Sequence, residues 1–218
     1  MDLDVSQLPV GPFPSNCYLV RTPSADEAVV VDPGWPGSAT DIRLELAGMG
    51  ARCVAILVTH GDLDHIGGVA ELAEGSGAPV WMAEDEAECL ERANDLKPAG
   101  FETVTLRSWT PENRLAGDET FEAAGIPFET VPVPGHTEAH LAFHVDGHLF
   151  SGDVLFAGSV GRTDRPNGDW DTLLESIRTL MDRFGPETVV YPGHGPVTTL
   201  GDELATNPFL VDLRAAAQ

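Results

Sequence analysis

The fold is decided by the stretch Val58-Thr-His-Gly-Asp-Leu-Asp-His-Ile-Gly-Gly68, between an apolar run and a helix-like run. It contains four potential metal ligands: His60, Asp62, Asp64 and His65. A strand end followed by a tight, glycine-flanked loop directs such side chains into one space. Crowded carboxylates and imidazoles repel each other or compete for protons unless a cation neutralises them. The alternative interpretation is a polar turn in which the acids, Asp64 in particular, cap the following helix.

Three later residues of the same chemical type each follow an apolar, β-rich segment and lie beside a glycine. They are His136 in Pro134-Gly-His-Thr137, Asp153 in Phe150-Ser-Gly-Asp-Val154, and His194 in Tyr191-Pro-Gly-His-Gly-Pro196. Glycine lets the backbone turn sharply and carry the neighbouring side chain into a cleft. These three positions favour the metal-site interpretation over the polar turn.

The complete set resembles the metallo-β-lactamase superfamily, whose pattern is His-x-His-x-Asp-His followed by His, Asp and His at later strand ends. Within that superfamily, the chain looks most like the small, single-domain glyoxalase II-like hydrolases, also called hydroxyacylglutathione hydrolase-like. Three further segments carry the resemblance: Pro12-Phe-Pro-Ser-Asn-Cys-Tyr18, Gly152-Asp-Val-Leu-Phe-Ala-Gly-Ser-Val-Gly-Arg-Thr-Asp164 and Thr206-Asn-Pro-Phe-Leu210. One position departs from the pattern, because Asp62 stands where the family has its second histidine.

The resemblance implies a site for two divalent metal ions, which would be zinc, iron or manganese. The first ion would take His60, Asp62 and His136, the second would take Asp64, His65 and His194, and Asp153 would bridge them. A metal-bound hydroxide would then be the nucleophile, because metals lower the pKa of bound water from about 15.7 to near 7. Asp64 would also orient this hydroxide and transfer a proton.

The carboxylate at position 62 changes what is expected of the first metal ion. It adds one negative charge, which makes the ion a weaker Lewis acid and shifts the preference from zinc towards iron or manganese. Aspartate is also shorter than histidine, so it would reach the metal less well, or only through a water molecule. We therefore expect a dinuclear site whose first position binds more weakly and is richer in iron or manganese.

Arg162 is the candidate contact for a substrate carboxylate or a thiol carrier, because a bidentate arginine suits a carboxylate. The alternative is that it pairs with Asp164 or Asp169 and only fixes its own loop.

Three histidines remain outside the pattern. His140 follows His136 by four residues, and its role is open between bracing the site and serving as an ordinary strand residue. We expect His144 and His148 to be ordinary strand or turn histidines, because they carry no ligand spacing.

Length and composition fit one globular domain. The chain has 218 residues, of which 42% are hydrophobic, and we expect residues 1–218 to form a single domain. No apolar run approaches the roughly 20 residues that a membrane span needs. The acidic start, Met1-Asp-Leu-Asp4, does not look like a secretory signal, so we expect a cytoplasmic protein. The cysteines, Cys17, Cys53 and Cys89, form no Cys-x-x-Cys pair and are expected to be buried free thiols.

The charge limits the partners. The formal net charge is −23, and Lys97 is the single lysine of the sequence. Such a surface repels polyphosphate, which argues against nucleic-acid binding and against the RNA-processing branch of the superfamily. We expect a small-molecule thioester as the partner, with no nucleic acid and no membrane, and the oligomeric state stays open.

The expected elements lie in two batches of strands, each followed by helices. Strands are expected at residues 3–10, 16–21, 28–32, 54–58 and 79–82, several more within 120–150, and a last one at 189–191. Helices are expected at residues 38–49 with Ser38 as the cap, 68–74, 84–94, 170–184, and finally 201–206. Residues 94–117 lack a clean period and are either a lid or substrate loop or an ordinary surface loop.

This order supports an α+β fold, a four-layer α/β/β/α sandwich of the metallo-β-lactamase type. Alternation alone equally permits a doubly wound sheet, and the resemblance decides for the sandwich.

The resemblance implies a metal-dependent thioester hydrolase of the hydroxyacylglutathione hydrolase type. The alternatives are an iron-dependent persulfide dioxygenase, a lactonase or β-lactamase, and a non-catalytic binding protein on the same fold, for which Asp62 is the only argument. Larger glyoxalase II enzymes bind glutathione partly through a C-terminal helical domain. The chain ends soon after His194, so we expect that domain to be absent and the thiol carrier to be open.

Overall fold

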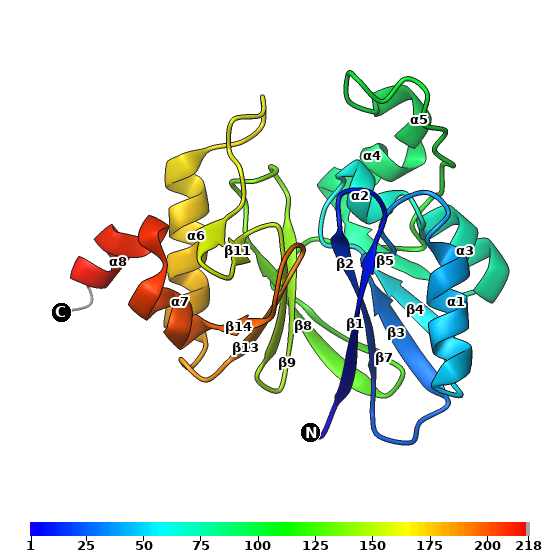
Figure 1. The fold of residues 1–218 in the computed structure, drawn as a ribbon, viewed down its shortest axis with the longest axis horizontal. Helices are drawn as coiled ribbons and strands as arrows, with labels where there is room; N and C mark the ends of the chain where they lie inside the picture. Colours follow the sequence, from blue (N-terminus) through cyan, green and yellow to red (C-terminus); the bar gives the residue numbers. More distant parts are fainter. Residues whose placement is uncertain (217–218) are drawn as a thin grey trace.

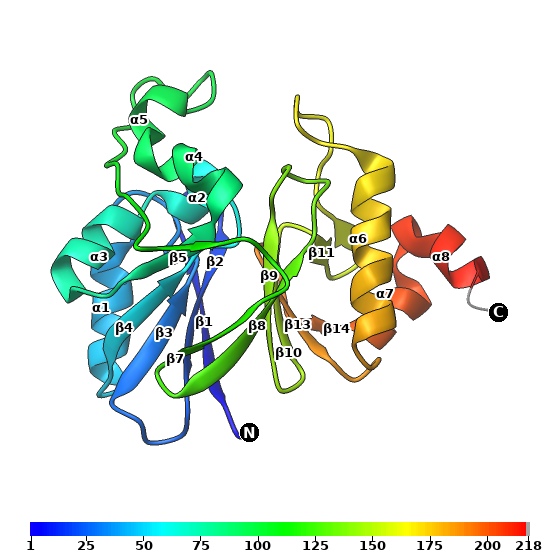
Figure 2. The same cartoon turned by 180° about the vertical axis from the view of Figure 1, so that it is seen from behind.

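Two six-stranded sheets stack at the centre of the molecule, and helices cover their outer faces (Figures 1 and 2). This computed structural model describes residues 1–216. The first sheet has the order β1(Asp4–Val10), β2(Ser15–Arg21), β3(Glu27–Val31), β4(Arg52–Leu57), β5(Val80–Ala83), β6(Asn113–Leu115). The second has the order β14(Thr198–Thr199), β13(Val189–Pro192), β10(His148–Gly152), β9(Leu141–Val145), β8(Ile126–Pro132), β7(Thr120–Ala123). A small hairpin consists of β11(Leu155–Phe156) and β12(Ser159–Val160).

The helices form the two outer layers. On the outer face of the first sheet lie α1(Ala39–Gly48) and α3(Val69–Ser76), and at its upper end in the view lie α2(Leu63–Ile66), α4(Ala87–Glu91) and α5(Ala93–Leu96) (Figure 1). The 3-10 turn η1(Glu84–Glu86) directly precedes α4. Over the second lie α6(Trp170–Arg183), α7(Leu200–Thr206), η2(Pro208–Leu210) and α8(Val211–Ala216) (Figure 1). The predicted four-layer α/β/β/α sandwich is confirmed, and a single doubly wound sheet is excluded.

Three buried clusters fill the three interfaces between these layers. In β2, Cys17 and Leu19 pack with α1 and α3, whereas Tyr18 and Val20 pack against the second sheet. The alternation follows from the period of two in a strand, and the run of residues 17–20 is continuously apolar because both faces of the strand are covered. The third cluster joins α6 to the second sheet through Leu173 and its neighbours. The chain therefore builds its core from both faces of each sheet.

Some element predictions were wrong in detail. The helix expected at residues 84–94 is broken at Arg92, whose backbone leaves the helical region with φ −120° and ψ 29°. The helix predicted to be last is followed by η2 and α8, because Pro208 starts a new turn that Asn207 caps. Ser38 occupies the predicted cap position but its side chain makes no capping hydrogen bond. Cys17 and Cys53 are buried as expected, whereas Cys89 is partly exposed.

The connections after several strands meet at one edge of the sandwich. The loops that follow β4, β8, β10 and β13 carry all the candidate ligands, and the segment after β3 joins them there. Gly135, with φ +126°, has room for no side chain, since a Cβ atom would lie 2.4 Å from the backbone nitrogen of Leu173. Within the described residues, no helix is long and apolar enough to cross a membrane.

The layer between the two sheets should dominate stability. We expect Phe143→Ala to lower the free energy of unfolding by about 3–5 kcal/mol, because Phe143 is fully buried there and a cavity would remain. Leu44→Ala is the control, since Leu44 is exposed on α1 and its loss should change the value by less than about 0.5 kcal/mol. Chemical denaturation of both variants measures this, and equal losses would contradict the assigned core.

Candidate metal centre

The first four candidate ligands come from one tight turn after β4. His60 lies in the loop, Asp62 occupies the N-cap position of α2, and Asp64 and His65 lie inside that helix. The alternative interpretation, in which Asp64 caps the following helix, is wrong, because the chain is already helical from Leu63. Asp62 has an extended backbone, and its side chain makes no capping hydrogen bond, so it is free to face the other ligands.

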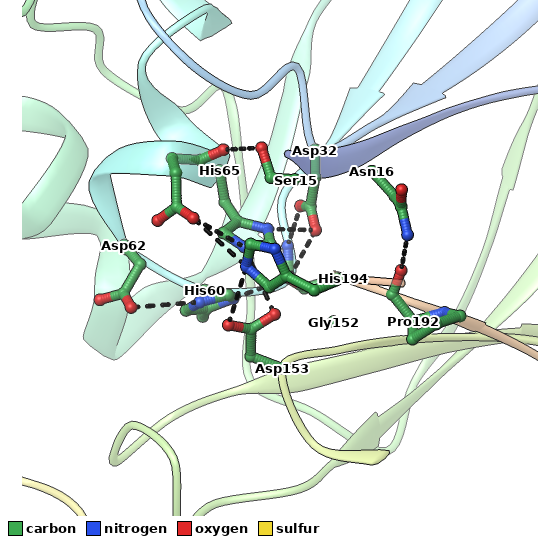
Figure 3. Close-up of polar contacts among 12 residues, drawn as sticks. Ser15, Asn16, Asp32, His60, Asp62, His65, Gly152, Asp153, Pro192 and His194 are labelled. Atoms are coloured by element: carbon green, nitrogen blue, oxygen red, sulfur yellow. Dashed lines mark hydrogen bonds and ion pairs between the residues drawn. The ribbon is translucent and has the colours of Figure 1, made fainter. Parts of the chain in front are cut away.

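The structure brings all seven predicted ligands together. Figure 3 shows His60, Asp62, His65, Asp153 and His194 around one centre. They form two groups whose potential ligand atoms lie within 4.8 Å of one another: His60, Asp62, His136 and Asp153 in one, and Asp64, His65 and His194 in the other. Apart from Asp153, for which the resemblance implies a bridging position, these are the sets that the resemblance implies for the first and second ions.

Asp153 lies between the two groups. Its Oδ1 is 3.4 Å from His65 Nε2, and its Oδ2 is 3.7 Å from His136 Nε2 and 3.5 Å from His194 Nε2. In Figure 3 the carboxylate of Asp153 points towards the histidine rings. It therefore has an oxygen near members of both groups, as expected of a bridging residue.

The donor atoms fit a cation. His60 Nε2, His65 Nε2 and Asp153 Oδ1 are buried and have no hydrogen-bond partner within the described structure. A buried polar atom without a partner costs free energy, so three such atoms directed into one space indicate a missing positive group. Nitrogen and carboxylate oxygen donors are the ligands that zinc, iron and manganese accept. The cluster thus suits a dinuclear metal site.

The charges of the cluster favour cations as well. Burial lowers the pKa of His194, but the Asp153 and Asp64 carboxylates raise it to about 10. Burial raises the pKa of the Asp153 carboxyl, but His65 and His194 hold it well below its ordinary value. The carboxylates therefore stay ionised, and without a metal they favour protonated imidazoles. Bound metal ions would supply this positive charge in place of the protons.

Each of the four candidate ligand histidines uses its Nδ1 atom for a hydrogen bond to the surrounding protein. His136 Nδ1 donates to the carbonyl of Arg162 at 2.8 Å, and His194 Nδ1 donates to the carbonyl of Pro14 at 3.1 Å. A carbonyl only accepts, so these Nδ1 atoms carry the protons and the Nε2 lone pairs face the centre.

The same arrangement holds for His60 and His65, through Asp32. Asp32 Oδ2 accepts from His65 Nδ1 at 2.9 Å and from the Thr59 hydroxyl at 2.8 Å, and that hydroxyl in turn accepts from His60 Nδ1 at 2.9 Å. The Thr59 backbone amide also donates to Asp32 Oδ1. Sequence analysis missed Asp32, which also follows a buried strand but precedes Pro33 and is not directly beside a glycine as the later ligands are.

His140 braces the centre, which answers the question left open by its spacing. It is fully buried, its ring stacks on that of His60 with centroids 4.6 Å apart, and its Nε2 accepts from the Asp153 amide at 3.1 Å. It therefore fixes the backbone that carries the Asp153 carboxylate. His144 and His148 contact Glu129 and Tyr191 instead, so they are ordinary strand histidines as expected.

A cavity of about 430 Å³ opens over the cluster. Part of its wall is aromatic: the rings of Phe13, Trp35 and Phe101 contact one another edge to face, with centroids 5.5–5.9 Å apart. Phe101 and Pro98 belong to the segment predicted as either a lid or a surface loop. Because both line the cavity, the interpretation as a substrate loop is favoured.

Two arginines line the same cavity. Arg162 makes a bidentate pair with Asp164, at 2.6 and 2.8 Å, and is exposed, so the predicted ion pair forms beside the cavity. Asp169 is not part of it and instead caps α6. Arg165, which sequence analysis did not single out, contacts Asp62.

The chain matches the description "Metallo-beta-lactamase superfamily" over residues 10–194 and belongs to this superfamily. It is therefore a metal-dependent hydrolase of that class, as the resemblance predicted. It is 32% identical over 211 residues to "Hydroxyacylglutathione hydrolase GloC" of Haemophilus influenzae, covering 95% of this chain and 98% of that protein.

Two solved structures are similar over almost their whole length. One is the BLEG-1 B3 metallo-β-lactamase, with a TM-score of 0.86 and 32% identity, covering 95% of this chain and 100% of that one. The other is TTHA1623 in a di-iron-bound form, with a TM-score of 0.82 and 36% identity, covering 94% of this chain and 100% of that one.

Asp32 should control metal affinity without touching the metal. We expect Asp32→Asn to weaken zinc binding about 10- to 100-fold, because it removes the charge that orients His65 and Thr59. The measurement is competition of the metal-free protein against a chelator of known affinity. Asp41→Asn, an exposed acid on α1, is the control. Equal affinity in the Asp32 variant and the unaltered protein would show that this carboxylate does not orient the ligands.

Proposed function

We propose that the protein is a thioester hydrolase of the hydroxyacylglutathione hydrolase type. The observation that carries the proposal is the set of unpartnered buried atoms, His60 Nε2, His65 Nε2 and Asp153 Oδ1, below a cavity large enough for a small organic substrate. The relative from Haemophilus influenzae is named a hydroxyacylglutathione hydrolase, and the similarity extends over 98% of its length. This similarity supports a thioester as the substrate.

In this proposal the two groups of ligands hold two divalent cations, and Asp153 is shared between them. When bound, such a pair of cations activates water at neutral pH and polarises a carbonyl group. Taken alone, the carboxylate of Asp62 favours iron or manganese at the first position over zinc. The di-iron form of the related TTHA1623 supports iron.

Asp64 is proposed to position the attacking water and to move its proton. Its carboxylate borders the cavity, and its Oδ2 lies 3.3 Å from His194 Nε2. Its backbone carbonyl accepts a hydrogen bond from the Ser15 hydroxyl at 2.7 Å, which fixes the turn that carries it. In the reaction the water oxygen bonds to the acyl carbon, the C–S bond breaks, and Asp64 passes the proton to the leaving sulfur.

The cavity wall offers binding groups for the rest of the substrate. The rings of Phe13, Trp35 and Phe101 provide an apolar surface for hydrocarbon parts of an acyl group or thiol. Arg162 and Arg165 are the arginines that border the cavity, and the exposed Arg162 is the one proposed to bind a substrate carboxylate, in exchange for Asp164. A substrate with both an apolar part and a carboxylate fits this distribution.

Removal of a ligand should abolish thioester hydrolysis. We expect His136→Ala and Asp153→Ala to lose turnover of lactoylglutathione by at least about a thousandfold and to retain fewer than two metal equivalents, while the fold persists. Turnover, metal content by plasma emission and circular dichroism measure this. The control is His144→Ala, since His144 contacts Glu129 away from the centre.

Unchanged turnover in either ligand variant would refute the assignment. A β-lactam is the competing substrate to be tested, because BLEG-1, which is 32% identical to this chain, is a B3 metallo-β-lactamase. Faster β-lactam than thioester hydrolysis by the unaltered protein would replace the proposed substrate class.

Arg162 should affect substrate binding more than turnover. We expect Arg162→Ala to raise KM about tenfold and to change kcat less than about twofold, because a contact to a remote carboxylate stabilises ground state and transition state alike. Asp164→Asn should lower KM, since it frees the guanidinium from its bidentate partner. A collapse of kcat with unchanged KM in Arg162→Ala would assign the arginine to the chemical step.

A further inference from the structure

Asp62 shares one carboxylate oxygen among three groups. Its Oδ2 lies 3.2 Å from His136 Nε2 and 3.7 Å from His60 Nε2, and the same atom contacts the Nη1 atom of Arg165. Arg165 is 103 positions further along the chain. The position that departs from the family pattern is therefore the one that a guanidinium reaches.

The side chain of Asp62 is directed to this contact rather than to its own helix. An aspartate at an N-cap usually accepts a hydrogen bond from a backbone N–H of the first turn. Asp62 occupies the N-cap of α2 with the extended backbone that this position requires, yet it makes no such bond. The carboxylate faces the imidazoles and Arg165 instead.

The loop that carries Arg165 is anchored to the strand end that carries His136. At one end, the Arg162 carbonyl accepts from His136 Nδ1 at 2.8 Å, and at the other, the Asp169 amide donates to the Gly135 carbonyl at 2.8 Å. Between them, the Gly168 amide closes a turn on the Arg165 carbonyl at 3.0 Å. Arg165 thus has a fixed place relative to the ligands.

Of the two arginines at the cavity, Arg165 is the one that contacts a carboxylate of the ligand cluster. Arg162 is neutralised by the bidentate contact with Asp164. Arg165 is partly buried, and its carboxylate partner, Asp62, is more deeply buried, with 15% of its side chain exposed. Charges so close to each other in a partly desolvated place are weakly screened.

We propose that Asp62 and Arg165 act as one unit that replaces, in place and in net charge, the neutral imidazole of the family pattern. The inference rests on the metal site of the proposed function and identifies Arg165 as a positioning residue for that site. The guanidinium holds the short aspartate side chain towards His60 and His136, and it cancels the negative charge that the aspartate adds.

The Asp62–Arg165 pair changes the zinc affinity expected when Asp62 is replaced by the histidine of the family pattern. If Asp62 stood alone, a histidine in its place would restore a tighter zinc site. With Arg165 present, Asp62→His leaves an unpaired guanidinium beside the first position, and like charges repel a divalent cation. The histidine becomes effective only when the arginine is also neutralised.

The test measures zinc affinity of the metal-free proteins by chelator competition, with metal content by plasma emission. We expect Asp62→His to bind zinc at the weaker position about tenfold less tightly than the unaltered protein. Adding Arg165→Gln to Asp62→His should restore the affinity to within about threefold. Adding Arg165→Lys instead should leave it weak, because the charge stays.

Arg162→Gln in the Asp62→His background is the matched control, because Arg162 is in the same loop but has its own acid. It should restore nothing. Restoration by Arg162→Gln to the same extent, no restoration by Arg165→Gln, or tighter zinc binding by Asp62→His alone would each overturn the inference.

These readouts are independent of the reaction. Two bound equivalents with no thioester turnover would remove the proposed substrate and leave the Asp62–Arg165 unit standing. Absence of bound metal in the unaltered protein would overturn both.

Discussion

The proton on each ligand histidine's Nδ1 atom is the constraint on which the rest of the centre depends. The acceptors come from distant segments: Thr59 and Asp32 at the ends of β4 and β3, Pro14 between β1 and β2, and the Arg162 carbonyl after β12. Each acceptor fixes a ring orientation and leaves the Nε2 lone pair facing inward. These contacts form only when the two sheets are stacked in their native arrangement. Formation of the sandwich therefore also assembles the centre.

Much of the centre could be predicted because its residues share one local signal. A polar residue beside a glycine at the end of an apolar strand is visible in the sequence, and the ends of neighbouring strands meet at the edge of a sheet. That signal found His136, Asp153 and His194, and the structure brings them to the His60–His65 turn. The layers needed the family resemblance, because hydrophobic periodicity alone does not distinguish two stacked sheets from one doubly wound sheet.

The residues that were missed act through partners remote in sequence. Asp32 lies 33 positions before His65, whose ring it orients, and nothing in the spacing indicates that pair. Arg165 lies 103 positions after Asp62 in a charged loop, where several arginines and acids are equally plausible partners. The alternative of Asp64 as a cap stayed open in the sequence because capping depends on where the helix begins, which here is one residue before Asp64. Local pattern thus locates ligands, whereas orientation and charge balance are properties of the fold.

The charge at position 62 shows why this distinction matters for function. Judged by itself, a carboxylate in place of an imidazole argues for a weakened metal site and hence for a binding protein without catalysis. Coulomb energy at a metal position, however, depends on the sum of nearby charges and not on the identity of one ligand. Arg165 contacts that carboxylate, and the field of a close ion pair falls off faster with distance than that of a lone charge. In the proposed unit, Arg165 offsets the charge that Asp62 adds, so the departure from the family pattern is consistent with catalysis, and the remainder of the ligand set matches that pattern.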